Sequence, residues 1–285
     1  MSRLDGLRVP RARRRARQGA AGQGILSAAV ALFVVLVAVI YFSKSKGERE
    51  RSAPPPPAGK APAGDDSERT DRVAQRAAVR KLRDRKILVI EEASDPDAPQ
   101  QKQVTSVNFC GTMYLGDQGV PDDLLAELRH FPDLQSLNLG DCKVTGGQLK
   151  YLAGLNRLAS LVLSGTAVDD HGLENISLLE TIESLNLRDT AISDAGLDYI
   201  ADLRSLKVLD LSKSKVTDAG MKKLKPLTEL KWLLLADTAI TDAGLDQLAP
   251  LVHLGRLTIN KTDVTKEGIA RLKRSIPALA VDSDP

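Results

Sequence analysis

The chain has 285 residues, of which 40 are Lys or Arg, 37 are Asp or Glu and 3% are aromatic. At about 150 residues per domain this length allows one or two domains, and two cysteines are too few for a disulfide scaffold. A formal net charge of +3 excludes a uniformly basic nucleic-acid-binding surface.

The charges are unevenly distributed along the chain. Residues 1–102 carry 21 basic and 12 acidic groups, residues 103–202 carry 5 and 15, and residues 203–285 carry 14 and 10. The acidic middle and the basic end could orient a charged partner, although solvated helices explain many of these charges equally well.

The first 43 residues predict a membrane anchor. Residues 1–17 are predicted to be a basic cytoplasmic tail, and the charge-free residues 18–43 a transmembrane signal-anchor helix. About 20 apolar residues in a helix span the bilayer core, and the segment ILSAAVALFVVLVAVIYF supplies 18. Seven arginines precede it and four basic residues follow, which predicts a cytoplasmic N-terminus. We therefore expect a single-pass protein of the cell (inner or plasma) membrane, with the remainder extracytoplasmic.

Two alternatives for this anchor stay open. A cleaved signal peptide shares the basic start, but no A-x-A-like site follows before Lys44. Basic runs can also bind nucleic acid, but membrane topology already explains this one, so we expect no nucleic-acid partner.

A linker and a capping segment come next. Residues 44–66 are rich in proline and small or charged residues and are predicted to be a disordered linker. Residues 67–130 are predicted to be an N-terminal cap, in which Ser67–Arg85 has helical spacing. Ile87–Ile90 and Val104–Phe109 are β-prone and predict a hairpin.

A repeat of 24 residues, present in six copies without insertions, occupies residues 131–274. Three apolar columns follow this period: Leu134, Leu158, Ile182, Leu206, Leu230 and Leu254; Leu137, Leu161, Leu185, Leu209, Leu233 and Leu257; and Leu139, Leu163, Leu187, Leu211, Leu235 and Ile259. A fourth column of small residues holds Cys142, Thr166, Thr190, Ser214, Thr238 and Thr262. Such regularity predicts stacked units that bury one another's apolar faces.

The repeat reads L-x-x-L-x-L-x-x-(C/T)-x-(V/I)-(T/S)-D-x-G-L and resembles the leucine-rich repeat family, in which L-x-x-L-x-L is followed by Asn or Cys. The T-D-A-G-L segment at Thr241–Leu245 resembles the cysteine-containing and bacterial subclasses, and residues 104–109 look like an earlier degenerate copy. The whole layout resembles bacterial membrane-anchored leucine-rich repeat proteins. The resemblance implies an α/β solenoid, with parallel strands on its concave side and short helices on its convex side, that binds other proteins.

Each repeat also has local signals of its own. The L-x-L alternation indicates a strand with its leucines facing the core, and the small hydroxyl column can satisfy the backbone of the following turn. Thr217 and Thr241 stand at the N-cap position, followed by aspartates that favour the helix dipole. The glycines of the helices allow either close packing or a positive φ. Residues 275–285 are predicted to be a C-terminal cap, with a last strand over Ala278–Val281.

No motif for catalysis is found. Three histidines are scattered, and metalloprotease, C-x-x-C, nucleophile-elbow and phosphate-loop signatures are missing. We expect no enzyme activity, no metal site and no cofactor. Cys142 is predicted to lie in the core, and its register makes a disulfide with Cys110 awkward, although an oxidising exterior keeps that bond open.

The outward positions of the strands indicate a binding surface. They form two columns: Ser106, Ser136, Ser160, Ser184, Val208, Trp232 and Arg256; and Asn108, Asn138, Val162, Asn186, Asp210, Leu234 and Thr258. Most of these residues are small and polar, and the apolar Val208, Trp232 and Leu234 cluster toward the C-terminal end, beside basic residues. We predict that Val208, Asp210, Trp232, Leu234 and Arg256 bind a protein or peptide partner.

Two other interpretations of these residues remain. Trp232 could simply pack over its neighbours or over the C-terminal cap. The whole chain could instead be a structural envelope scaffold or spacer that self-associates or contacts cell-wall material.

Overall fold

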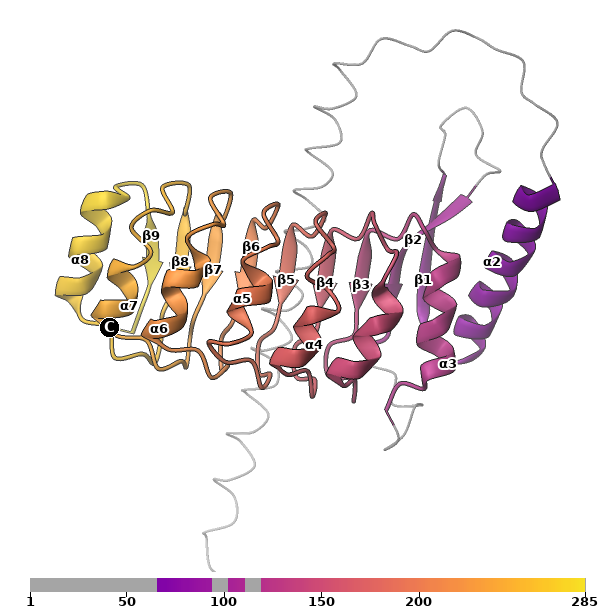
Figure 1. The fold of residues 1–285 in the computed structure, drawn as a ribbon, viewed down its shortest axis with the longest axis horizontal. Helices are drawn as coiled ribbons and strands as arrows, with labels where there is room; N and C mark the ends of the chain where they lie inside the picture. Colours follow the sequence, from indigo (N-terminus) through magenta and orange to yellow (C-terminus); the bar gives the residue numbers. More distant parts are fainter. Residues whose placement is uncertain (1–65, 94–101, 111–118, 285) are drawn as a thin grey trace, which may run out of the picture. The chain divides into compact units, whose positions relative to one another are not determined.

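The computed structural model of the chain describes residues 66–93, 102–110 and 119–284 (Figure 1). Its main feature is one sheet of nine strands in sequence order. The strands are β1 (Leu88–Ala93), β2 (Lys102–Asn108), β3 (Ser136–Asn138), β4 (Ser160–Val162), β5 (Ser184–Asn186), β6 (Val208–Asp210), β7 (Trp232–Leu234), β8 (Arg256–Thr258) and β9 (Ala280–Asp282).

The repeat period sets the register of this sheet. β1 and β2 pair antiparallel, and every later pair is parallel. From β3 to β9 each residue lies opposite the residue 24 positions along, as Leu209 lies opposite Leu233. The parallel leucine-rich repeat solenoid predicted from the sequence is therefore confirmed.

Short helices cover one face of the sheet (Figure 1). The α-helices are α2 (Asp66–Asp84), α3 (Asp122–Leu125), α4 (Asp170–Glu174), α5 (Leu197–Ile200), α6 (Asp218–Met221), α7 (Asp242–Asp246) and α8 (Lys266–Ser275). The 3₁₀-helices are η3 (Ala126–His130), η4 (Gly146–Leu152) and η5 (Lys222–Leu224). We call the opposite face, which carries the outward columns, the outer face of the sheet.

The core lies between the sheet and the helices. All eighteen residues of the three apolar columns are 0–2% exposed and belong to one cluster. Because each strand presents only one or two leucines inward, a single repeat has too little apolar surface to fold alone and depends on its neighbours.

Small hydroxyl residues close the turn after each strand. Thr190 Oγ1 and Thr238 Oγ1 each donate to the carbonyl three residues earlier at 2.6 Å. In the first repeat the Cys142 thiol takes this place and contacts the carbonyls of Phe109 and Gly140 at 3.6 and 3.5 Å. The buried carbonyls at the end of each strand are thereby satisfied, as the column predicts.

A left-handed residue follows each strand at the same 24-residue interval. Positive φ angles occur at Asp141, Gly165, Asp189, Lys213, Asp237 and Lys261. The helix glycines, by contrast, lack a positive φ, so close packing is the correct one of their two explanations. At Gly244 an added Cβ would collide with the Asp218 carboxylate of the preceding repeat.

Both ends of the core are covered. At the N-terminal end, α2 contributes the buried residues Ala78, Val79 and Leu82. At the C-terminal end, β9 pairs in parallel with β8. This last strand begins two residues later than predicted and ends one residue later, because it keeps the 24-residue period and places Ala280 opposite Arg256.

The predicted membrane location is contradicted. In the part of the chain that the structure describes, no helix is both long enough and apolar enough to cross a bilayer. The segment on which the prediction depended, residues 18–43, lies outside the described residues, as do the predicted tail (1–17) and the linker up to residue 65. The N-terminal transmembrane helix is therefore not part of the fold described here.

Candidate binding surface

The outer face of the sheet brings the two predicted columns together in ordered rows. Val208 lies opposite Trp232, and Trp232 lies opposite Arg256. Asp210 lies opposite Leu234 on the same face. Side chains alternate between the two faces of a strand, so these five residues form one continuous area, which we call the Trp232 patch.

Exposure differs along this face. The small side chains of Ser160 and Ser184, in β4 and β5, are buried at 7% and 6% exposure. In β7 and β8, by contrast, Trp232, Leu234 and Arg256 are half-buried. The accessible apolar surface on this half of the sheet is therefore that of the Trp232 patch.

Arg256 lies in β8, at the edge of the patch next to β9. Its guanidinium lies 5.8 Å from the centre of the Trp232 ring, within the range of a cation–π contact. Its Nε also lies 3.3 Å from Asp282 Oδ2 in β9. The ring is thus contacted from the side of the C-terminal cap while part of it stays accessible.

Asp210 differs from the other members of the patch because it is 0% exposed. Its Oδ1 accepts a hydrogen bond from the Ser212 amide at 2.9 Å. Burial raises the pKa of the Asp210 carboxyl above its usual value, and the Ser212 amide, the Ser212 side chain and the charge of Arg188 oppose that rise. Asp210 therefore contributes no exposed charge to the patch in this conformation.

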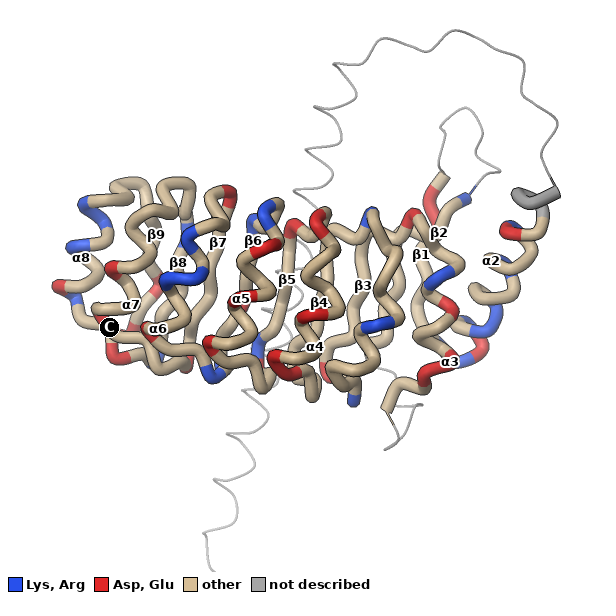
Figure 2. Tube along the Cα trace, viewed as in Figure 1, with Lys and Arg blue, Asp and Glu red and all other residues tan. Residues whose placement is uncertain are grey.

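The basic residues near the patch are partly neutralised. Lys207 Nζ lies 2.8 Å from Glu183 Oε2 at the entry to the neighbouring strand. On the helical side, acidic and basic residues are interspersed along the chain (Figure 2). On this side of the described residues, therefore, the acidic middle and the basic end of the sequence do not appear as separate regions of one charge.

Catalytic and metal-binding groups do not gather in the described residues. No cluster of three or more His, Cys, Asp or Glu side chains has the arrangement of a metal site in this part of the chain. Cys110 is exposed and Cys142 buried, and neither forms a disulfide. Desolvation raises the pKa of Cys142 to about 12, so its thiol is neutral at physiological pH.

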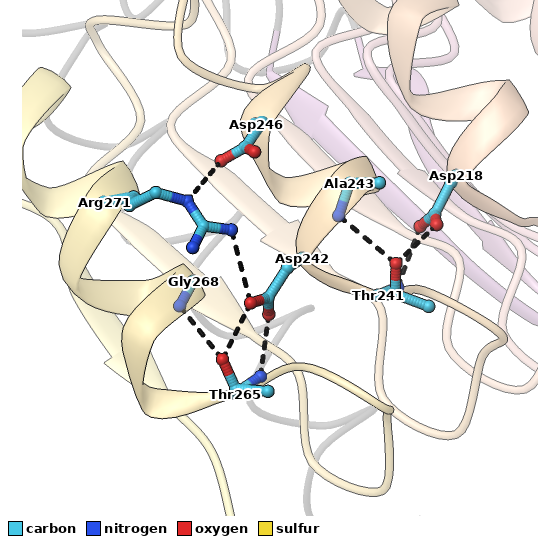
Figure 3. Close-up of polar contacts among 8 residues, drawn as sticks. All are labelled: Asp218, Thr241, Asp242, Ala243, Asp246, Thr265, Gly268 and Arg271. Atoms are coloured by element: carbon cyan, nitrogen blue, oxygen red, sulfur yellow. Dashed lines mark hydrogen bonds and ion pairs between the residues drawn. The ribbon is translucent and has the colours of Figure 1, made fainter.

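Sequence reasoning missed a ladder of carboxylates on the helical side. Asp242 accepts hydrogen bonds from the Thr265 amide at 2.8 Å and from Thr265 Oγ1 at 2.7 Å, and Asp218 does the same with Thr241 (Figure 3). The signal was present as an aspartate followed 23 residues later by Thr or Ser. These aspartates connect successive repeats in addition to favouring the helix dipole.

Sequence reasoning also missed an apolar pair at the other end of the outer face. Leu88 and Ile90 are 56% and 43% exposed and lie opposite Asn108 and Ser106. The alternation within the β-prone segment could have shown that both point to the outer face.

Comparison with known proteins agrees with the repeat. A family model for the leucine-rich repeat matches residues 179–201 and 202–225. No protein with a curated function matches the chain in sequence.

Three solved structures are similar in part. Internalin C2 of Listeria monocytogenes is 22% identical with a TM-score of 0.44, over 58% of this chain and 84% of that one. The internalin inlF of the same organism is 16% identical with a TM-score of 0.36, over 56% and 57%. A leucine-rich repeat protein of Leptospira interrogans is 19% identical with a TM-score of 0.43, over 55% and 45%.

With TM-scores below 0.5, these overlays carry no weight, and the assignment depends on the repeat itself. The 24-residue period, the parallel sheet in that same register and the two matched repeats support a leucine-rich repeat family for this chain.

Proposed function

We propose that the chain is a binding module that recognises a protein or peptide partner through the Trp232 patch. Recognition is non-covalent and uses no cofactor. Leucine-rich repeat domains are protein-interaction modules in general, and the patch is the part of this chain that we assign to contact.

The observation that carries the proposal is the half-buried Trp232, which has Val208 opposite it in β6 and the Arg256 guanidinium against its ring, with Leu234 two residues along β7. Tryptophan and arginine are enriched among the residues that contribute most to binding, because the tryptophan ring buries much surface with only two χ angles and the guanidinium offers five hydrogen-bond donors. The β7 strand pairs with a neighbour on each side, so a partner would meet a surface that is already formed.

Affinity purification with the full chain as bait tests this proposal. We expect at least one protein from the source organism to be retained by the wild type and lost with Trp232→Ala, since truncating a hot-spot tryptophan costs about 2 kcal/mol or more. Leu178→Ala is the matched control, because Leu178 is 84% exposed and lies outside the sheet. A partner profile unchanged by Trp232→Ala would contradict the proposal.

Self-association is separated from partner binding by sedimentation velocity on the same three proteins. A monomer at micromolar concentration agrees with a module that binds another protein. Oligomers of the wild type that dissociate in Trp232→Ala would instead favour the structural scaffold that the sequence left open.

A further inference from the structure

One column of the outer face repeats the same turn with one chemical difference. Asn108, Asn138 and Asn186 each accept, through Oδ1, the backbone amide two residues later at 2.8–2.9 Å. Asp210 makes the same bond at 2.9 Å to Ser212. The turn needs one acceptor oxygen, which an asparagine supplies, so the fold does not require the second carboxylate oxygen of Asp210.

That second oxygen forms no full hydrogen bond, and the Ser212 side chain that acts on the carboxyl carries no charge. Among the described residues, Asp210 Oδ2 and Ser212 Oγ are the buried side-chain oxygens that form no hydrogen bond. Buried polar groups are nearly always paired, and an unpaired buried carboxylate is especially costly. Burial raises the pKa of Asp210 because removal from water disfavours the charged form of the carboxyl.

The surroundings favour a cationic partner group over an apolar one. Leu234 lies directly opposite Asp210 and Trp232 directly opposite Val208, so apolar surface adjoins the carboxylate. Two basic residues of the adjoining rows are engaged with other acids: Lys207 with Glu183, and Arg256 with Asp282. Arg188 acts on Asp210 through its charge but does not satisfy Oδ2.

We propose that Asp210 Oδ2 and Ser212 Oγ form a subsite for a lysine or arginine side chain of the protein or peptide that binds the Trp232 patch. The inference rests on the proposed function and names the chemistry of the partner. An ammonium or guanidinium group has enough donors for both oxygens and neutralises the buried charge. Its aliphatic stem would lie along Leu234 and Trp232. Because Asp210 is covered, entry requires a neighbouring side chain to change rotamer, which is common when interfaces form.

The test is selection from a random peptide library displayed on phage, with the full chain as bait in three forms: wild type, Asp210→Asn and Trp232→Ala. Asp210→Asn keeps the turn, as Asn186 does in β5, and its thermal midpoint should be at or above that of the wild type. We expect wild-type peptides to contain a basic residue beside apolar ones and to bind Asp210→Asn about 30-fold or more weakly.

A double-mutant cycle on one selected peptide makes the assignment specific. Replacing its lysine by norleucine should weaken binding to the wild type at least tenfold and to Asp210→Asn less than twofold. The subsite would be overturned if the selected peptides lack basic residues, or if no peptide is selected above an unrelated bait. It would also be overturned if replacing the lysine weakens binding to the wild type and to Asp210→Asn equally. Peptides that lose affinity for Trp232→Ala but not for Asp210→Asn would overturn only the subsite. Peptides that bind Trp232→Ala undiminished would overturn the proposed function.

Discussion

The carboxylate of Asp218 accepts two hydrogen bonds from Thr241, one from the backbone amide at 2.8 Å and one from Oγ1 at 2.6 Å. The same pair of bonds occurs at four successive junctions and so connects five repeats, through Asp170 and Ser193, Asp194 and Thr217, Asp218 and Thr241, and Asp242 and Thr265. Three of the donors, Thr217, Thr241 and Thr265, are the N-cap residues of α6, α7 and α8, so their aspartates connect one repeat to the start of the helix in the next. In a stack stabilised by nearest neighbours, these bonds add directly to the interface between repeats.

Asp218→Ala should lower the free energy of unfolding by about 1–3 kcal/mol, because it leaves the Thr241 amide and hydroxyl without their acceptor. Urea unfolding followed by circular dichroism measures the change. Glu229→Ala, at an exposed position, should stay within about 0.5 kcal/mol of the wild type. Equal stability of the two variants would show that the ladder contributes nothing.

Gly244→Ala should also destabilise the chain, by about 1–3 kcal/mol, because the new methyl group collides with the Asp218 carboxylate. Helix propensity alone favours alanine by up to about 1 kcal/mol, so the sign of the effect identifies the collision. Gly147→Ala is the matched control, since nothing lies within 4 Å of its added Cβ, and it should be neutral or stabilising. A stabilised Gly244→Ala variant would contradict the packing described here.

Acid should weaken the last interface of the ladder. Hydrogen bonds from Thr265, with a further contribution from Arg271, hold the pKa of Asp242 below its usual value. Because the folded pKa is the lower one, the stabilisation is complete above the unfolded pKa of about 3.9 and is lost as the pH falls toward the folded value. The stability difference between wild type and Asp242→Asn, followed by urea unfolding from pH 6 to pH 3, should therefore shrink below about pH 4. A difference that stays constant over this range would contradict the assignment.

The two cysteines should differ in reactivity. Cys110 is exposed, whereas Cys142 is buried and its pKa is raised to about 12, so only Cys110 should react with a thiol-specific chromogenic disulfide in the native protein. Two thiols should react in guanidinium chloride. Two reactive thiols in the native state would show that the turn around Cys142 opens readily, and none in denaturant would reveal a disulfide.

The strands and the core could be predicted from the sequence because they depend on spacing alone. Leu209 and Leu233 recur at the period of one coil, and any stack with that period places them side by side. The last strand could be placed only within two residues, because its own sequence is short and the period, not local β-propensity, fixes its position.

Features that depend on lateral contacts could not be predicted in the same way. The positive φ at Asp141 and Lys213 is imposed by the turn, and only Gly165 gives a sequence signal for it. The complete burial of Asp210 depends on how neighbouring side chains cover it, which the period does not determine. The Trp232 patch could be proposed from the sequence because its composition differs from the mostly small, polar residues in the rest of the two columns.

Fluorine NMR of the full chain labelled with 5-fluorotryptophan tests the central claim most directly, since Trp232 is the only tryptophan and gives one resonance. We predict that a stoichiometric amount of a partner isolated with the wild-type chain shifts or broadens this resonance, and that the resonance saturates at the affinity measured independently by calorimetry. A partner that binds by calorimetry while the Trp232 resonance keeps its position and width would place the binding surface elsewhere and contradict the account.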